Sequence, residues 1–290
     1  MKQEIISRAL SIIQARRRTA ESEYSNILSP LYEDENFVEL NKKYTRLVIE
    51  NARKEANGEP FDKNEELKLK TELDKLKNHA TPNYSCKICD DVGYVNGHMC
   101  KCLKKEISSI LLAGSGFDKL EKFEEAMKTS GQLLPTYHLM QKWCNSDFKK
   151  TLIYLSGPTG VGKTYLVRAM ANDLIERGKV VRIVTAFAMN QDFKEFSKKH
   201  NDELLNKYID CEVLFIDDLG TEPLYKNVTL EYLYLVINER KMRKLPTIIT
   251  SNLDLGDIIE RYDERISSRI VDRETSITIL LQGNDRRIKN

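Results

Sequence analysis

Two kinds of hydrophobic pattern divide the chain. Up to about residue 80, apolar positions recur three or four residues apart, which is the spacing of one face of an α-helix. The first such stripe consists of Ile6, Ala9, Leu10, Ile13, Ala20, Tyr24, Ile27, Leu28 and Leu31, and Pro30 interrupts it. Further helical stretches carry Leu40, Tyr44, Leu47 and Val48, and then Leu69, Leu73 and Leu76. The pattern predicts a small all-α domain whose stripes form its own core or include a surface for a partner.

From residue 151 the pattern changes to short apolar runs rich in β-branched residues. They read TLIYLSG from 151, VVRIVTA from 180, CEVLFIDD from 211, LPTIITSN from 245 and TSITILL from 275. Segments of helix length separate these runs. Such alternation is typical of an α/β domain with a mostly parallel sheet covered by helices on both faces. We therefore expect a helical domain at 1–80, a cysteine module at 81–105, a helical connector at 106–150 and the α/β domain at 151–290.

The composition limits which binding partners and which cellular compartment we expect. The 46 basic and 44 acidic residues nearly cancel, so nucleic-acid binding would depend on a local patch and not on the overall field. Glu4 and Arg8 interrupt the first residues, and no apolar run approaches the roughly 20 residues that cross a bilayer. We expect a cytoplasmic protein without a membrane partner.

The first candidate site is a phosphate-binding loop. Gly157, Pro158, Thr159, Gly160, Val161, Gly162, Lys163 and Thr164 fit the pattern G-x-x-x-x-G-K-[ST] between a predicted strand and a predicted helix. The glycines let backbone N–H groups approach phosphate oxygens, and a helix N-terminus adds partial positive charge. Lys163 can reach the terminal phosphates and the Thr164 hydroxyl can ligate Mg2+. The pattern predicts that a nucleoside triphosphate and Mg2+ bind here.

Polar side chains follow two other strands. Asp217 and Asp218 end one strand, and ligands of open α/β sheets bind beyond such carboxyl ends. Asp217 fits a carboxylate that holds Mg2+ directly or through a water molecule. Asp218 fits a group that orients and deprotonates the attacking water, with Glu222 as a weaker substitute, although an Asp here can also be a turn or capping residue. Asn252 ends the next strand and could sense the γ-phosphate, although an Asn also begins turns.

Arginines near the C-terminus suggest a site shared between subunits. Arg265 and Arg269 lie four residues apart on one helix face, and either surface ion pairs or a trans-acting arginine finger explains them. Arg286 and Arg287 are candidates for sensing phosphate within the same chain.

Four cysteines suggest a metal site. Cys86, Cys89, Cys100 and Cys102 have the spacing of a four-thiolate zinc site, with His98 as an alternative ligand and a redox pair as the rival interpretation. A site with four thiolates has no open position, so we expect a structural role for Zn2+.

Together these motifs resemble the AAA+ ATPases. The stretches IDDLGTE, TIITSN and ERISSRI, after a cysteine module and a helical front end, are similar to bacterial helicase loaders of the DnaC/DnaI type and to transposition helper ATPases of the IstB type. The resemblance implies that the chain binds the replicative DNA helicase and single-stranded DNA, self-associates through its ATP sites and hydrolyses ATP. It also implies that Arg269 is the arginine finger and Arg287 the phosphate sensor. Many AAA+ enzymes have Glu where Asp218 stands, and the shorter carboxylate suggests slow, switch-like hydrolysis.

The resemblance also implies a DNA contact between the second and third strands. Phe193 and Phe196 there accompany Lys194, Lys198 and Lys199, a mixture of stacking and phosphate-binding groups, although aromatic residues three apart are usually core. The alternatives to a helicase loader are a transposition helper ATPase and a nucleotide-gated adaptor in which hydrolysis is dispensable.

Overall fold

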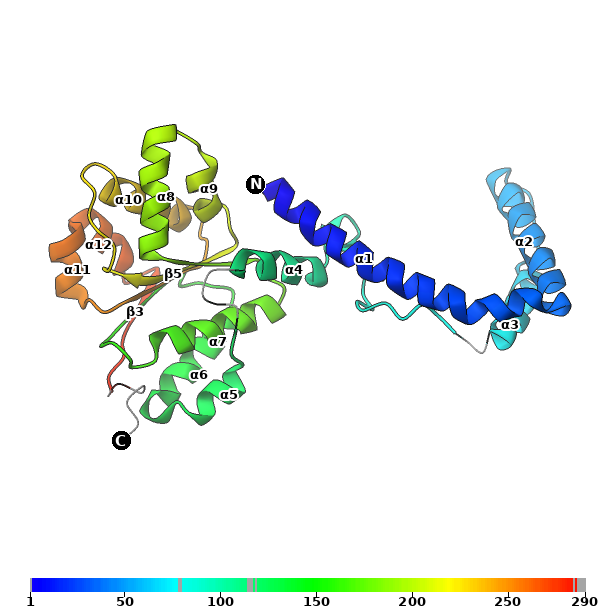
Figure 1. Cartoon of the computed structure of the whole chain (residues 1–290), viewed down its shortest axis with the longest axis horizontal. Coiled ribbons are helices and arrows are strands. Elements are labelled where there is room, and N and C mark those ends of the chain that lie inside the picture. The colour runs from blue at the N-terminus through cyan, green and yellow to red at the C-terminus, as the bar shows by residue number, and fades with distance from the viewer. Residues whose placement is uncertain (1, 78–79, 114–116, 118, 284, 286–290) are drawn as a thin grey trace. The chain divides into compact units, whose positions relative to one another are not determined.

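The computed structural model describes residues 2–77, 80–113, 117, 119–283 and 285 (Figure 1). Its contacts divide the chain into two compact units, residues 10–93 and residues 1–9 together with 94–290. None of the helices in these described ranges is both long and apolar enough to cross a membrane.

The smaller unit is built from helices, as the apolar spacing predicts. It contains most of α1 (Lys2–Leu28), followed by η1 (Ser29–Glu33), α2 (Glu35–Ala56) and α3 (Lys63–Leu76). The Asp34 side chain caps α2 by accepting from Phe37 N at 3.0 Å. Phe37 and Leu73 are buried, whereas Ile27 is 64% exposed. Ala20 and Leu28 of the same predicted stripe are buried, so the stripe is only partly core.

The larger unit contains the predicted five-stranded parallel sheet. Its strands are β3 (Leu152–Ser156), β4 (Val181–Thr185), β5 (Val213–Leu219), β6 (Thr247–Ser251) and β7 (Ser276–Leu280), in the spatial order β4-β5-β6-β3-β7. Every pairing between them is parallel. The predicted α/β fold class is confirmed.

Successive residues of a strand point to opposite faces of the sheet, and they pack in two hydrophobic clusters, one on each face. Ile153 and Leu155 pack in one cluster with residues of α5 (Phe123–Lys128), α6 (Leu134–Cys144) and α7 (Lys163–Glu176). Leu152 and Tyr154 pack in the opposite cluster, with residues of five helices. These helices are α8 (Ala186–Lys199), α9 (Glu203–Ile209), α10 (Thr229–Met242), α11 (Leu255–Tyr262) and α12 (Glu264–Ile270). Helices therefore cover both faces of the sheet (Figure 1).

The segment expected to be a connector packs as part of the larger unit. After the short strands β1 (Tyr94–Val95) and β2 (His98–Met99), α4 (Lys101–Leu112) contacts β4, and η2 (Gly131–Leu133) precedes α6. Tyr137 and Trp143 of α6 lie in the same cluster as Ile153. The Trp143 indole donates to Lys150 O at 2.7 Å. Residues 106–150 thus contribute core to the sheet and not only a link to it.

A fully buried arginine joins the loops that precede two central strands. Arg240 of α10 is 0% exposed. Its Nη1 donates to the carbonyl oxygens of Tyr208 and Cys211, each at 2.8 Å, and its Nη2 donates to Pro246 O at 2.7 Å. Its Nε donates to Thr247 Oγ1 at 2.8 Å. One guanidinium thereby satisfies backbone acceptors on the chain entering β5 and on the chain entering β6.

We expect Arg240→Met to lower the free energy of unfolding of the larger unit by about 3 to 5 kcal/mol, because it leaves several buried carbonyl groups unpaired. Urea denaturation followed by circular dichroism measures this change. The matched control is Arg243→Met, since the Arg243 pair with Asp210 is exposed and should be worth about 1 kcal/mol or less. Equal losses in both variants would contradict the role given to Arg240.

Candidate functional site

The phosphate-binding loop lies between β3 and α7, where the sequence predicts it. Gly157, Gly160 and Gly162 have φ values of +149°, +77° and +114°, a region that side chains disfavour. A Cβ atom at Gly157 would overlap the carbonyl oxygen of Leu281, so no larger residue fits there. Val161 is 1% exposed and its side chain packs in the hydrophobic cluster, so only its backbone groups could contact a ligand. The loop therefore has the glycine conformations that allow its backbone to turn around a phosphate group.

Lys163 occupies the centre of this loop. Its side chain is 5% exposed, and Nζ donates to Gly157 O at 2.7 Å and to Pro158 O at 3.0 Å. It also donates to Asn252 Oδ1 at 2.6 Å. The structure thus brings together Lys163 and the polar residue that ends β6, two groups 89 positions apart in the sequence.

Asp217 lies beside the hydroxyl groups of two threonines. Thr250 Oγ1 donates to Asp217 Oδ1 at 2.6 Å, and Thr164 Oγ1 lies 3.4 Å from Asp217 Oδ2. Burial raises the pKa of Asp217, the Thr250 hydrogen bond opposes the rise, and the neighbouring charge of Asp218 adds to it. Two adjacent carboxyl groups with a hydroxyl, at the start of a helix, are the oxygen donors that Mg2+ prefers. The residues present fit this ion.

A cavity of about 860 Å3 lies over these groups. Its lining includes the predicted residues Thr159, Gly160, Gly162, Lys163, Thr164, Asp218 and Asn252. Three further residues, Thr129, Tyr165 and Arg168, also line it. Sequence reasoning missed them: Tyr165 and Arg168 follow the loop within one helical turn, a signal that was available, but Thr129 comes from a distant segment that carries no motif.

Glu222 is not placed to replace Asp218. Its side chain is 2% exposed and accepts from Gly220 N at 2.9 Å and from the Tyr262 hydroxyl. Arg261 donates to the Glu222 carbonyl oxygen. Glu222 therefore links the turn after β5 to α11, and its carboxylate is occupied by these hydrogen bonds. The weaker interpretation of this residue as a water-activating base is wrong.

Arg269 lies on the α10 side of α12, outside the lining of the cavity over Lys163. Its Nε donates to Asn238 Oδ1 at 2.9 Å and its Nη2 donates to the Tyr234 hydroxyl at 2.8 Å. The guanidinium carbon lies 4.4 Å from the centre of the Tyr234 ring. Arg265 pairs with Asp263 at 3.3 Å. Arg286 and Arg287, the expected phosphate sensors, lie outside the described residues.

The aromatic residues expected to contact DNA are part of the core. Phe193 is 1% exposed and packs against the rings of Tyr208 and Tyr232. Of the two interpretations of Phe193, a base contact or a core residue, the structure supports the core residue. Phe196 is half-buried against Tyr232, and Lys194 lies 4.5 Å from the ring centre of Tyr225.

The four predicted cysteines lie together. The sulfur atoms of Cys86, Cys89, Cys100 and Cys102 are within 4.8 Å of one another. His98 is exposed on β2 and is not a member of this cluster. The Asp91 carboxylate accepts from Ser85 N at 2.7 Å and Cys86 N at 2.9 Å, which fixes the first turn of the module. Four thiols at this separation match the donor set of a closed, tetrahedral metal site.

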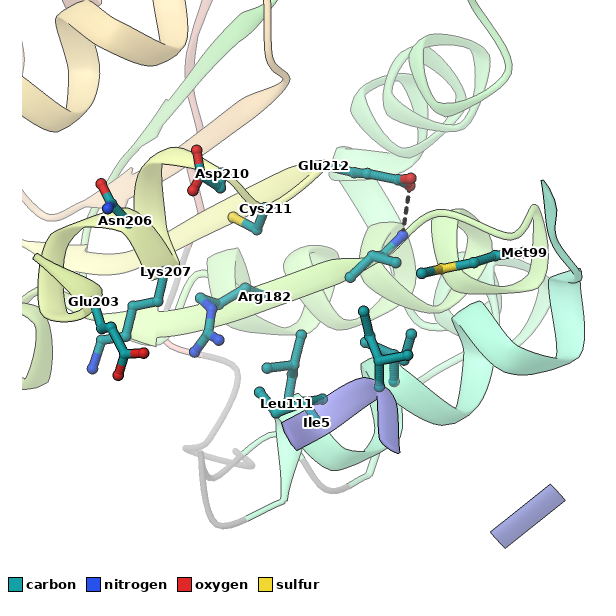
Figure 2. A pocket seen from close by; sticks show the side chains of 13 residues that line it. Ile5, Met99, Leu111, Arg182, Glu203, Asn206, Lys207, Asp210, Cys211 and Glu212 are labelled. Atoms are coloured by element: carbon teal, nitrogen blue, oxygen red, sulfur yellow. Dashed lines mark hydrogen bonds between the residues drawn. The ribbon is translucent and has the colours of Figure 1, made fainter. Parts of the chain in front are cut away.

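A second cavity, of about 320 Å3, lies between α4, α9 and the edge strand β4 (Figure 2). Several charged groups of its lining have partners. Glu212 accepts from Val180 N at 2.8 Å, and Asp210 pairs with Arg243 at 2.9 Å. Lys207 pairs with Asp192 at 2.6 Å. Ile5, Ile107 and Leu111 give this cavity apolar walls, and the phosphate-binding loop is not part of it. The cavity over Lys163 is therefore the candidate nucleotide site.

Comparison with known proteins agrees with this geometry. Residues 139–290 match the family described as IstB-like ATP binding protein. The phage-like element PBSX protein XkdC of Bacillus subtilis (strain 168) is 27% identical over 242 residues, which cover 72% of this chain and 87% of that protein. The replicative helicase loader DnaC of Escherichia coli (strain K12) is 31% identical over 121 residues, which cover 40% of this chain and 48% of that protein. The chain thus spans about half the length of this loader.

Two solved structures match part of this chain. The crystal structure of DnaI is 28% identical, with a TM-score of 0.44, over 53% of this chain and 84% of that chain. The crystal structure of the DnaC helicase loader is 21% identical, with a TM-score of 0.47, over 53% of this chain and 91% of that chain.

We expect Arg168→Ala to weaken ATP binding roughly 10-fold, because it removes a cation from the wall of a cavity suited to a polyanion. Titration with a fluorescent ATP analogue measures the dissociation constant. Arg182→Ala is the matched control, since Arg182 lines the second cavity (Figure 2) and should leave ATP affinity unchanged. An unchanged affinity in Arg168→Ala would remove Arg168 from the nucleotide site.

Proposed function

The chain belongs to the family of IstB-like ATP-binding proteins and is an AAA+ ATPase, and on this premise we propose that it is a helicase loader. In this proposal it binds the replicative DNA helicase, delivers it to single-stranded DNA and uses ATP as the timing signal. The observation that carries the proposal is the ATP-site cluster, which lies within residues 139–290 that match the IstB-like family, in a chain of which 121 residues are 31% identical to a replicative helicase loader. The helical front end supplies the region that contacts the helicase.

Each residue of the cluster has a role that its position supports. Backbone N–H groups of the loop and the Lys163 amine hold the phosphates. Thr164 and Asp217 would hold Mg2+, which supplies positive charge to the phosphates during transfer to water. Asp218 orients the attacking water and accepts its proton, and Asn252 keeps the Lys163 amine aligned through its amide oxygen.

Self-association completes the site in this proposal. Arg269 lies outside the cavity of its own chain and is partly exposed on α12, beside Tyr234. A guanidinium held in this way can reach a neighbouring subunit's ATP, as trans-acting arginines do in other nucleotide hydrolases. ATP would then join subunits along single-stranded DNA, and hydrolysis would release them.

A transposition helper ATPase is the second candidate function, because the matched family carries the IstB name. Such a protein would act on a transposase and not on a helicase. A gene for a transposase beside this one would favour the second candidate, and a gene for a replicative helicase or primase would favour the first.

A loading assay with two variants tests the first candidate. The chain should allow its host's replicative helicase to unwind a duplex that adjoins protein-coated single-stranded DNA. Lys163→Ala should abolish ATP binding and loading together. Asp218→Asn should keep ATP affinity but lower turnover about 100-fold, because it removes the general base. Loading at the wild-type rate by Asp218→Asn would show that hydrolysis is dispensable, and no stimulation by the wild-type chain would reject the loader function.

We propose that the cysteine cluster holds one structural Zn2+. Metal analysis of protein purified without chelators should find about one zinc per chain, and Cys86→Ser should lower this content at least about fivefold, because a three-thiolate site binds the ion less tightly. Cys144→Ala is the matched control, since Cys144 is buried in the hydrophobic cluster of the larger unit and should leave the zinc content unchanged. Zinc content that is equal in wild type and Cys86→Ser would contradict the assignment.

A further inference from the structure

The pairing of β5 and β6 contains an irregularity at the two aspartates. Ile216 lies opposite Ile249 and Leu219 lies opposite Ser251, so Asp217 and Asp218 together face the single residue Thr250. Such an extra residue is a β-bulge. In a regular strand, successive side chains point to opposite faces of the sheet, and Asp217 and Asp218 would be separated in this way.

The bulge changes the direction of the second aspartate. Asp218 has φ of +56°, in the left-handed region that residues with a side chain rarely adopt. It lines the same cavity as Lys163 and Thr164, while Asp217 lies beside Thr164 Oγ1. Both carboxyl groups therefore serve one site although they are adjacent in a strand. An uncommon backbone conformation persists only where neighbouring groups hold it.

One hydroxyl group holds both aspartates at this bulge. Thr250 Oγ1 donates to Asp217 Oδ1 at 2.6 Å and accepts from Asp218 N at 2.9 Å. Thr250 is 1% exposed, so water does not compete for these bonds. Thr221 Oγ1 donates to Asp218 O at 2.9 Å and anchors the other side of the same residue. Because the bulge interrupts the ladder between β5 and β6, the Thr250 hydroxyl supplies a link between the strands at the two aspartates, and the Ser251 hydroxyl, which donates to Leu219 O at 2.5 Å, supplies the next one.

We propose that Thr250 is the positioning residue of the ATP site, and that its hydroxyl fixes the carboxyl groups of Asp217 and Asp218 in one arrangement for Mg2+ and for water. This inference rests on the proposed hydrolysis of ATP at the cavity over Lys163. Thr250 lies on β6, two residues before Asn252, so the strand that ends in the Lys163 contact also sets both aspartates. A methyl group in place of the hydroxyl cannot donate to Asp217 or accept from Asp218.

The test compares Thr250→Val, Thr250→Ser and Thr247→Val in the full chain. Valine has nearly the shape of threonine without the hydroxyl, and we expect kcat to fall about 10- to 100-fold while KM for ATP stays within about threefold. The Mg2+ concentration for half-maximal binding of an ATP analogue should rise. Serine restores the hydroxyl, so Thr250→Ser should keep kcat within about threefold of wild type. Thr247→Val removes a buried hydroxyl from the opposite end of β6, at Arg240, and should lower the melting temperature without lowering kcat.

Three results would overturn the assignment of Thr250. They are a Thr250→Val kcat within about twofold of wild type, a Thr250→Ser kcat as low as that of Thr250→Val, and an equal loss of kcat in Thr247→Val. If the wild-type chain hydrolyses no ATP, the proposed function fails, and the Mg2+ concentration for half-maximal binding of the ATP analogue tests Thr250 by itself. A rise of this concentration in Thr250→Val, with none in Thr250→Ser or Thr247→Val, supports the inference. Equal Mg2+ dependence in wild type and Thr250→Val rejects it.

Discussion

The parallel pairing of β3, β5 and β6 is the constraint on which the site depends. Because all three strands run in the same direction, their carboxyl ends meet at one edge of the sheet, where the phosphate-binding loop, the two aspartates and Asn252 emerge. The hydrogen bond from Lys163 to Asn252 joins the loop that follows β3 to the end of β6. The hydrogen bond from Thr250 to Asp217 joins β6 to β5. The ATP-site residues therefore come together only because the strands that carry them are neighbours in the sheet.

Much of this arrangement could be predicted from short stretches of sequence. The loop at 157–164, the five strands and the cysteine cluster each have a local pattern that a fixed spacing or an apolar run reveals. Lys163, Asp217 and Asn252 were recognised because each directly follows a predicted strand or its loop. Local pattern was informative here because the loop conformation and the strand ends are fixed by residues that are neighbours in the chain.

Other residues could not be found in this way because their roles depend on distant partners. Arg240 lies in a run of charged residues typical of a solvated helix face, and only the carbonyl groups before β5 and β6 make it a buried clamp. Thr250 is one polar residue in an apolar strand, and its contacts lie 33 and 32 positions away. The choice between a core residue and a DNA contact for Phe193 also depended on distant residues, since Tyr208 and Tyr232 pack against its ring. The spacing of apolar residues predicts which face of a helix or strand is buried, but not which polar groups of distant residues will contact that face.

In the proposed function, the nucleotide bound at this edge of the sheet controls the affinity of the chain for a replicative helicase. The dissociation constant between the chain and its host's replicative helicase, measured by biolayer interferometry with Mg2+ and either ATP or ADP, tests this coupling. We expect a complex whose dissociation constant differs at least about 10-fold between the two nucleotides, a coupling of ordinary size for two linked sites. This difference should disappear in Lys163→Ala. Absence of a complex, or equal affinity with both nucleotides, would show that the nucleotide does not control helicase binding.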